Sequence, residues 1–353
     1  MNIRKIAELA GVSTATVSYV LNGTKNVTAD KKKRVMEVVS KYGYQTNSIA
    51  KSLRVKRTDN IGVLVEDIRG FSVPAIINGI SERAGENGYR ILLNDLQMLE
   101  SLFNKYDQIT QHKDRINAAI SLLLYGARVD AVIYVGMFDR DITGIINAID
   151  KPLVIAYSTA SETAVRSVTY DNENISCEAI KYLFNQGHRR IAVITGLSRT
   201  FPARARMKGV LRAFKEAGYE PDASLILNGD WEYAAGYSRG SELVDMKDPP
   251  TAIFAMNDLM AAGTMDAISD AGLNVPKDIS VVGFDNREIA AYLRPKLTTV
   301  DIDLKGIGLA AAQTVIDMLR NRDLTTTPKK TVIPCKMVLR NTVATINFSK
   351  GAL

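Results

Sequence analysis

The chain has 353 residues, of which 46% are hydrophobic and 24% charged, enough for two or three ordinary globular domains. No apolar run approaches the roughly 18 residues that a membrane span needs, and residues 1–10 alternate charged and apolar side chains, unlike a signal peptide. Cys177 and Cys335 lie far apart and form no CxxC pair, so the composition predicts a cytoplasmic protein with reduced thiols and no membrane contact.

The positive charge is concentrated in the first sixth of the chain. Residues 1–60 hold 12 Lys and Arg against four Asp and Glu, a formal charge of +8. Because the whole chain carries +7, residues 61–353 together carry −1. This distribution predicts a polyanionic partner for the N-terminal segment.

Three short amphipathic helices are predicted within this basic segment. Apolar residues spaced i, i+3, i+4 and i+7 give the first helix one apolar face, which consists of Ile3, Ile6, Ala7 and Ala10. Gly11 permits a tight turn, and Ser13 is a good N-cap for a second helix that ends at Asn22. Thr28 can cap a third helix. The apolar faces of the second and third helices are Val17, Val20 and Leu21, and Val35, Val38, Val39 and Tyr42.

This arrangement predicts a helix-turn-helix DNA-binding domain over residues 1–46. A three-helix bundle that binds protein is the alternative, which the +8 charge disfavours. The second helix of a helix-turn-helix enters the major groove by its N-terminal end. We expect Thr14, Ala15 and Tyr19 to contact base edges, and Thr16 and Ser18 to contact phosphates. The other candidate DNA contacts are Asn22, Lys31, Arg34, Asn47, Leu53 and Arg54.

The run IRKIAELAGVSTATVSYVLNG, residues 3–23, resembles the head of the lac repressor/galactose repressor (LacI/GalR) family of transcriptional regulators. The match continues through residues 41–44 and 47–53 and covers essentially the whole chain. The resemblance implies an all-α head and an α/β body of two doubly wound parallel-sheet lobes, like a periplasmic binding protein. One departure is Tyr19, because most members carry a basic residue there. The operator sequence therefore cannot be inferred from relatives.

Residues 47–59 are predicted to form a hinge. A helix of one or two turns is marginal in water and should order only beside a partner. Leu53 lies among Lys51, Arg54, Lys56 and Arg57, a composition that suits insertion of an apolar wedge into the minor groove. From composition alone, packing of Leu53 against the head or body is an equal alternative. The resemblance to the family implies the wedge.

The body, residues 60–345, is predicted to be α/β. Continuous apolar runs separated by helical stretches indicate parallel sheets that are covered on both faces. The predicted strands are residues 60–66, 90–93, 131–135, 152–156, 191–195, 251–255 and 279–283. The resemblance implies two lobes crossed by several segments, which we place at about 60–158 with 289–322, and at about 159–288 with 323–345.

Polar residues follow several of these strands, where α/β sheets bind ligands. We expect Asp67, Asn94, Tyr157, Asn257 and Asp285 to line a cleft, although loop ends are polar by default. The resemblance implies that Arg206 and Trp231 also face it, and Phe71 lies in the loop after the first strand. Carboxylate, amide and guanidinium groups can hold hydroxyls, and an indole can cover the C–H face of a sugar.

Two alternatives remain open for these residues. Trp231, the only Trp of the chain, could instead pack in the core, and Asp258 could be a helix cap or an ion-pair partner. The segment 95–117 is longer than the usual helix of the family. A predicted extra helix there, with an apolar face, would flank the cleft or extend the dimer contact. That face consists of Leu99, Leu102, Phe103 and Tyr106.

The nucleotide-binding motifs GxGxxG and GxxxxGK[ST] are absent from the sequence, and His112 and His188 are not spaced as metal ligands. His188 is expected in a surface turn. We therefore expect no enzyme, cofactor or metal site. The prediction is a homodimeric repressor that binds a pseudo-palindromic operator and responds to a sugar or sugar derivative. The alternative is a global regulator of the same fold that is controlled mainly by a protein partner.

Overall fold

The computed structural model describes residues 1–22, 26–44, 57–102, 108–160, 165–320 and 328–346. The chain divides into two compact units, Met1–Thr58 and Asp59–Leu353, which we call the head and the body. Among the described helices, none combines the length and the hydrophobicity that a membrane crossing requires.

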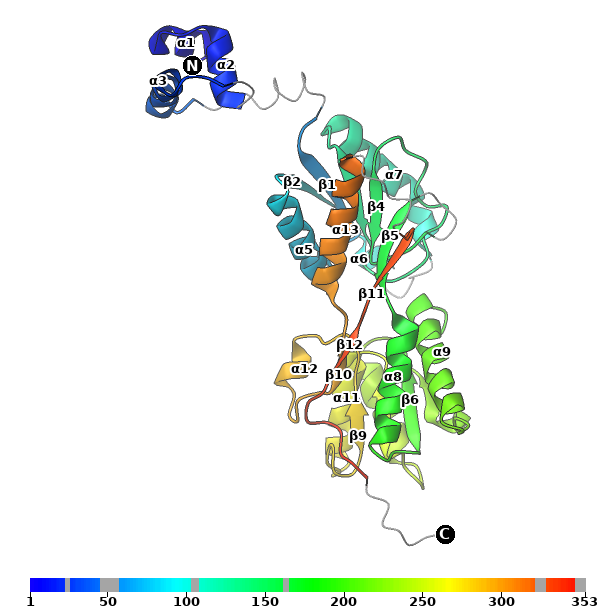
Figure 1. Ribbon diagram of the computed structural model, residues 1–353. Coiled ribbons are helices and arrows are strands. Elements are labelled where there is room, and N and C mark those ends of the chain that lie inside the picture. The colour runs from blue at the N-terminus through cyan, green and yellow to red at the C-terminus, as the bar shows by residue number, and fades with distance from the viewer. Residues whose placement is uncertain (23–25, 45–56, 103–107, 161–164, 321–327, 347–353) are drawn as a thin grey trace. The chain divides into compact units, whose positions relative to one another are not determined.

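The head contains the three predicted helices, α1 (Ile3–Ala10), α2 (Thr14–Asn22) and α3 (Ala29–Lys41) (Figure 1). Gly11 ends α1 in the left-handed conformation, with φ 61°. The predicted cap of α2 is present, because the Thr16 amide donates to Ser13 Oγ at 3.1 Å. The predicted cap of α3 is wrong in part: Thr28 occupies the N-cap position, but its side chain makes no capping hydrogen bond.

The head has its own small hydrophobic core. Its buried members are Ile6, Ala7, Ala10, Val17 and Val35. The prediction was wrong for two apolar positions, because Ile3 is 37% exposed and Tyr42 is 48% exposed. Tyr44 packs against this core instead of Tyr42.

The first lobe of the body is built on a six-stranded parallel sheet with the order β11-β5-β4-β3-β1-β2. Its strands are β1 (Asn60–Val65), β2 (Arg90–Asp95), β3 (Ala131–Val135), β4 (Leu153–Ala156), β5 (Arg166–Tyr170) and β11 (Lys330–Ile333). Its helices are α5 (Val73–Glu86), α6 (Leu99–Leu102), η1 (Gln108–His112), α7 (Lys113–Ser121), η2 (Leu122–Gly126) and α13 (Leu304–Leu319).

Both faces are buried in the middle of this sheet, because alternate residues of β1, β3 and β4 enter different cores. Ile133 joins the core formed with α5 and α13, whereas Val132 and Tyr134 join a second core formed with α7. Helices α5 and α13 pack closely at Gly79, where an added Cβ would lie 2.2 Å from the Lys305 carbonyl oxygen.

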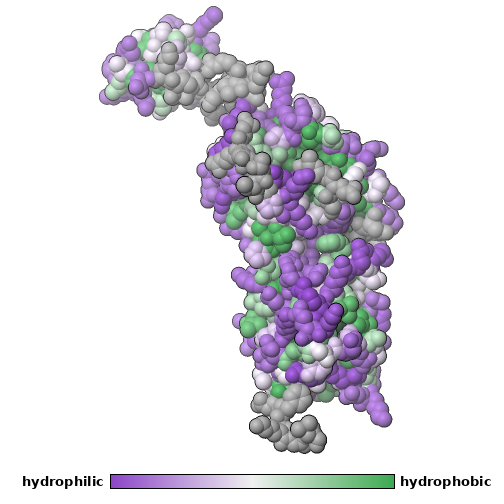
Figure 2. Space-filling model, turned by 45° about the vertical axis from the view of Figure 1, so that its right-hand side comes forward, coloured by the Kyte–Doolittle hydropathy of each residue, from purple (hydrophilic) through white to green (hydrophobic). Residues whose placement is uncertain are grey.

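The second lobe contains a four-stranded parallel sheet with the order β7-β6-β8-β9 and a two-stranded antiparallel sheet, β10-β12. Its strands are β6 (Ile191–Thr195), β7 (Ile226–Asn228), β8 (Ala252–Ala255), β9 (Ser280–Val282), β10 (Thr299–Asp301) and β12 (Lys336–Val338). Its helices are α8 (Asn172–Asn185), α9 (Phe201–Glu216), η3 (Ala223–Leu225), α10 (Tyr233–Val244), α11 (Asp258–Asp270) and α12 (Ile289–Tyr292). Hydrophilic side chains dominate the face of the body seen in Figure 2.

The predicted fold class is confirmed, but the predicted lobe boundaries need correction. Strands β5 and β11 both belong to the first-lobe sheet. The chain therefore crosses between β5 and α8, between β10 and α13, and between β11 and β12 (Figure 1). The predicted crossings near 159, 289 and 323 come too early, because the pairing of these strands depends on contacts distant in the sequence.

Candidate functional site

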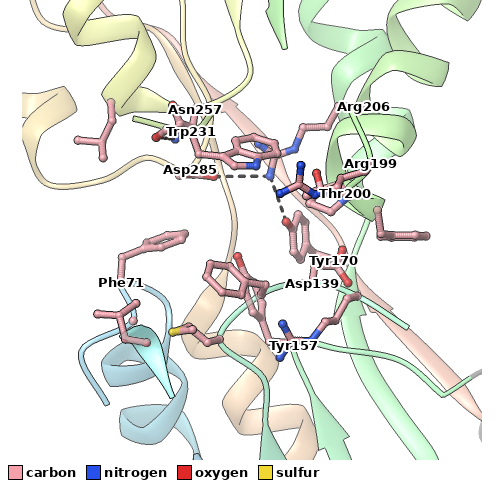
Figure 3. A pocket seen from close by; sticks show the side chains of 18 of the residues that line it. Phe71, Asp139, Tyr157, Tyr170, Arg199, Thr200, Arg206, Trp231, Asn257 and Asp285 are labelled. Carbon is pink, nitrogen blue, oxygen red and sulfur yellow. Dashed lines mark hydrogen bonds and ion pairs between the residues drawn. The ribbon is translucent and has the colours of Figure 1, made fainter. Parts of the chain in front are cut away.

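A cavity of about 560 Å³ lies between the two lobes of the body (Figure 3). This volume is in the range that small-molecule sites occupy, roughly 300–1,000 Å³. Six of the eight predicted effector residues line the cavity, three of them at the ends of β4, β8 and β9 and the others in loops or in α9. They are Phe71, Tyr157, Arg206, Trp231, Asn257 and Asp285.

Arg206 is the most constrained of these side chains. It is 3% exposed and projects from α9 (Phe201–Glu216). Its Nε donates to Asn172 Oδ1 at 2.8 Å and its Nη2 to the Tyr170 hydroxyl at 3.1 Å, while Nη1 donates to the Met256 carbonyl. The Phe284 ring lies 3.5 Å from the guanidinium carbon. The donors of Arg206 are thus largely engaged by the protein, which fixes its charge in the cavity wall.

Asp285 pairs with two arginines inside the cavity. Its Oδ1 lies 3.6 Å from Arg206 Nη2, and its Oδ2 accepts from Arg287 Nε at 3.3 Å. Burial raises the pKa of the Asp285 carboxyl, and the two neighbouring arginines oppose that shift. Its remaining lone pairs make Asp285 the natural acceptor for a ligand hydroxyl.

Two neighbours, Gly196 and Asn257, hold Trp231 in its position at the cavity. Its ring would lie 1.9 Å from a Cβ added at Gly196, so only glycine fits there. Asn257 Oδ1 caps α11 by accepting from the Met260 amide at 2.8 Å, and its Nδ2 donates to the Trp231 carbonyl at 2.7 Å. Core packing of Trp231 is only part of its environment, since it is partly exposed and lines the cavity.

Left-handed backbone conformations concentrate at this cavity. Tyr157, Trp231 and Asp285 have φ values of 61°, 80° and 106°, and all three line it. Each such residue costs on the order of 1 kcal/mol or more, and such strain clusters at functional sites. The fold therefore holds these side chains in place at a measurable cost.

In the head, the described residues among the predicted DNA contacts lie on two helices, α2 and α3. Thr14 and Ala15 are exposed at the start of α2, Thr16, Ser18 and Tyr19 are half-buried, and Val17 is buried in the core. Lys31 and Arg34 are exposed on α3, and Arg34 pairs with Asp30 at 3.2 Å. Asn22 is the last residue of α2. Asn47, Leu53 and Arg54 lie outside the described residues.

Comparisons with known proteins agree with this architecture. Residues 2–47 match the family described as bacterial regulatory proteins, lacI family, and residues 180–343 match the periplasmic binding protein-like domain. Catabolite control protein A of Priestia megaterium is 32% identical over 313 residues, which cover 88% of this chain and 90% of that protein. The chain belongs to the LacI family.

Other relatives cover the chain almost completely. The HTH-type transcriptional repressor PurR of Actinobacillus pleuropneumoniae serotype 3 is 30% identical over 348 residues, 98% of this chain and 99% of that protein. The crystal structure of the lac repressor dimer bound to operator and the anti-inducer ONPF superposes with a TM-score of 0.79 and 25% identity, and it covers 98% of this chain and 99% of that one. The predicted membership of the family is confirmed, and the relatives named here are transcriptional regulators.

Two predicted effector residues of this LacI-family body do not line the cavity. Asp67 is fully buried, and its carboxylate accepts from Arg69 and from the Leu99 amide at 2.8 Å. It therefore supports Arg69, which does line the cavity. Asn94 lies within the edge strand β2 and is not one of the lining residues. Asp258 is also absent from the lining: its carboxylate accepts from Thr299 and from the Arg287 amide at 2.6 Å, and burial raises its pKa to about 8.

Sequence reasoning missed Asp139 on the first lobe. It lies beyond the end of β3, is 3% exposed and lines the cavity. Its Oδ2 accepts from Asn172 Nδ2 at 2.6 Å, and Asn172 in turn accepts from Arg206, so a buried network joins the two lobes. Burial raises the pKa of Asp139 to about 6. Reading further past the strand would have found it.

The segment 95–117 contributes to the cavity through Leu99 and Ile109. The predicted extra helix is short where it is described, α6 (Leu99–Leu102), and Phe103 and Tyr106 lie outside the described residues. The predicted surface position of His188 is wrong. It is 1% exposed, and its ring nitrogens lie 3.0 Å from Thr251 Oγ1 and 3.1 Å from the Ala344 carbonyl oxygen. Within the described ranges, no group of three or more His, Cys, Asp or Glu could hold a metal ion.

Proposed function

We propose that this LacI-family chain is a transcriptional repressor. It binds a pseudo-palindromic operator as a homodimer and is controlled by a sugar or sugar derivative in the interlobe cavity. The observation that carries the effector proposal is the buried Asp285–Arg206 pair, 3.6 Å apart, beside Trp231 in a cavity of about 560 Å³. A carboxylate that accepts hydroxyl donors next to an indole face suits a pyranose ring.

The head supports the DNA part of the proposal. Thr14 and Ala15 are exposed at the N-terminal end of α2, the end that a recognition helix directs at the bases. A dimer supplies two such helices, so the half-sites should lie about one helical turn apart. The two Leu53 side chains of the dimer, one from each hinge, would then insert at the centre of the operator.

The effector can act only through different affinities for the DNA-binding and non-binding states. Asp139 and Asn172 connect the first lobe to Arg206, and Arg206 pairs with Asp285. A ligand that contacts Asp285 would therefore contact a hydrogen-bond network that both lobes share. We propose that ligand binding changes the lobe arrangement and, through it, the hinges.

The test uses the full-length protein. Operators are selected from random duplex DNA, and a sugar library is then screened for release or tightening of the selected operator. We expect a near-palindromic sequence and at least one active sugar. Asp285→Asn should abolish the response while it leaves operator affinity in the absence of sugar unchanged, and Glu178→Gln, an exposed acid on α8, should retain it. A sugar response that survives in Asp285→Asn would contradict the cavity proposal, and a library without any active sugar would favour control by a protein partner.

A further inference from the structure

The buried carboxylates of the body differ in their partners. Three of them form ion pairs with arginine side chains: Glu66 with Arg140, Asp67 with Arg69, and Asp285 with Arg206 and Arg287. In the described part of the chain, the buried Asp139 and Asp258 form no such pair. Of these two, Asp139 lines the cavity and Asp258 does not.

Asp139 is held by two neutral donors from the point where the chain crosses between β5 and α8. Thr169 Oγ1 donates to its Oδ1 at 3.2 Å, and Asn172 Nδ2 donates to its Oδ2 at 2.6 Å. Because a buried charge without a paired cation is costly, this carboxyl takes up a proton more readily than an exposed one. Burial raises the pKa of Asp139 to about 6.

The charged and titratable groups that face Asp139 come from four elements. Lys330 of β11 and Arg206 of α9 favour its ionised form through their positive charges. Tyr170 at the end of β5 and Tyr157 after β4 also face it, and burial raises the pKa of both phenols. Between pH 5 and 8 these four neighbours keep their charge state, whereas Asp139 changes its own.

Asn172 connects the charge of Asp139 to the position of Arg206. A guanidinium group can only donate, so Asn172 Oδ1 must face Arg206 Nε, which lies 2.8 Å away. The amide nitrogen of Asn172 then needs an acceptor, and Asp139 supplies it. A hydrogen bond to an ionised acceptor is roughly twice as strong as a neutral one. The ionised Asp139 therefore fixes the orientation of Asn172.

Arg206 in turn lies beside the groups that the cavity offers to a ligand. Its guanidinium carbon is 5.5 Å from the centre of the Trp231 ring, and its Nη2 is 3.6 Å from Asp285 Oδ1. Figure 3 shows Arg206 between these residues and Tyr170, with Asp139 on the first-lobe side. A change at Asp139 can thus reach the ligand-facing side chains through a single intermediate, Asn172.

We propose, building on the function proposed above, that Asp139 is a positioning residue whose ionised form holds Arg206, through Asn172, in the arrangement that binds the effector. When Asp139 takes up a proton, its bond to Asn172 weakens and Arg206 is held less firmly. Groups that are ordered before binding lose less entropy when a ligand binds. The cavity should therefore bind its effector more tightly at pH 7.5 than at pH 5.

The first test needs no ligand, because Trp231 is the only tryptophan and lies next to Arg206. Asp139→Asn is a neutral side chain of nearly the same shape as the protonated acid. In the full-length protein, the Trp231 emission of this variant should differ from that of wild type at pH 7.5 and coincide with it at pH 5. Other titrating groups are common to both proteins and cancel in the comparison. Glu178→Gln, a matched change at an exposed position of α8, should follow wild type at every pH.

A second comparison tests the connection through Asn172. Asn172→Ala and the double variant Asn172→Ala with Asp139→Asn should have the same emission at pH 5 and pH 7.5, because the connection is missing in both. A difference between them that appears only at pH 7.5 would show that the charge of Asp139 acts on the indole directly, which overturns the positioning role. Urea unfolding at pH 7.5 checks that each variant is folded.

A sugar that is active in the operator assay gives the third comparison. By titration calorimetry, Asp139→Asn should bind it about fivefold more weakly than wild type at pH 7.5 and within about twofold of wild type at pH 5. A ratio that is the same at both pH values would assign Asp139 a structural role alone and overturn the proposal. Coincident emission of wild type and Asp139→Asn at pH 7.5 would also overturn it. If no sugar is active, the proposed function fails, whereas the emission comparisons still decide whether Asp139 positions Arg206.

Discussion

Glycine at position 196 determines where Trp231 can lie. The indole atom Cζ2 of Trp231 would be 1.9 Å from a Cβ at this position, a distance that no packing adjustment of a rigid ring absorbs locally. Trp231 is also held through its carbonyl by Asn257 and has a left-handed backbone with φ 80°. The indole is thus positioned by backbone constraints on two sides.

Gly196→Ala should therefore displace the indole. We expect a shifted emission maximum of this single tryptophan and at least about fivefold weaker effector binding, since an aromatic contact contributes on the order of 1 kcal/mol. Gly85→Ala is the control, because Gly85 lies in α5 with nothing within 4 Å of an added Cβ. It should leave emission and binding unchanged and stabilise the body by about 0.5–1 kcal/mol. An unshifted spectrum in Gly196→Ala would show that the indole does not occupy the described position.

At the scale of elements, Asp67 joins the end of β1 to the start of α6. Its carboxylate accepts from the Arg69 side chain and from the Leu99 amide. The hydrogen bond from the Arg69 side chain is the main cause that lowers the pKa of Asp67 from 3.8 to about 2. Because the pKa of the folded state lies below the ordinary value, this carboxylate stabilises the body above about pH 4.

Asp67→Asn should lower the free energy of unfolding at pH 7 by about 1–2 kcal/mol, a value reduced because Arg69 is half-exposed. The stabilisation is lost as the pH falls from about 4 towards 2, so the difference between wild type and variant should shrink over that window. Urea unfolding at pH 7 and at pH 3 measures it. A difference that stays constant with pH would assign the effect to packing rather than to charge.

Most strands that the sequence predicts are buried on both faces, because they form continuous apolar runs; the edge strand β2 is the exception, since its apolar run includes the exposed Leu92 and Leu93. Strand β5, with the sequence RSVTY, carries three polar or charged residues although four of its five are buried, and β11 alternates exposed and half-buried residues at a sheet edge. Strands β7, β10 and β12 have three residues each, too few for a pattern. These strands are defined by pairing with distant segments, which local periodicity does not contain.

The same dependence on contacts between distant segments decides which residues of the site the sequence predicts. Tyr157, Asn257 and Asp285 directly or closely follow predicted strands, so the rule for strand ends finds them. The prediction that Arg206 and Trp231 face the cleft rests on the resemblance to the family. Leu99 and Ile109 reach the cavity only because Asp67 and the second core of the first lobe position their segment. Such packing is a property of the folded chain and has no local sequence signal.

At the scale of the whole molecule, the excess positive charge lies in the head, whereas the candidate ligand cavity lies in the body. The first 60 residues carry +8, whereas the remainder carries −1. The head and body are separate compact units, and the head core does not share buried residues with the body. A domain as small as the head is only marginally stable by itself, whereas the body has enough interior to fold alone.

A fragment of residues 59–353 should therefore remain folded, bind effector within about twofold of the affinity of the full chain, and lose DNA binding. Operator affinity of the full chain should fall steeply with salt, by roughly 10³-fold between 50 and 200 mM if about six phosphates are contacted. Calorimetry of the fragment and DNA binding at several salt concentrations measure these effects. Effector affinity that collapses with removal of the head would show that the head contributes to the cavity, and salt-insensitive DNA binding would mean that the basic side chains of the head do not contact the phosphates.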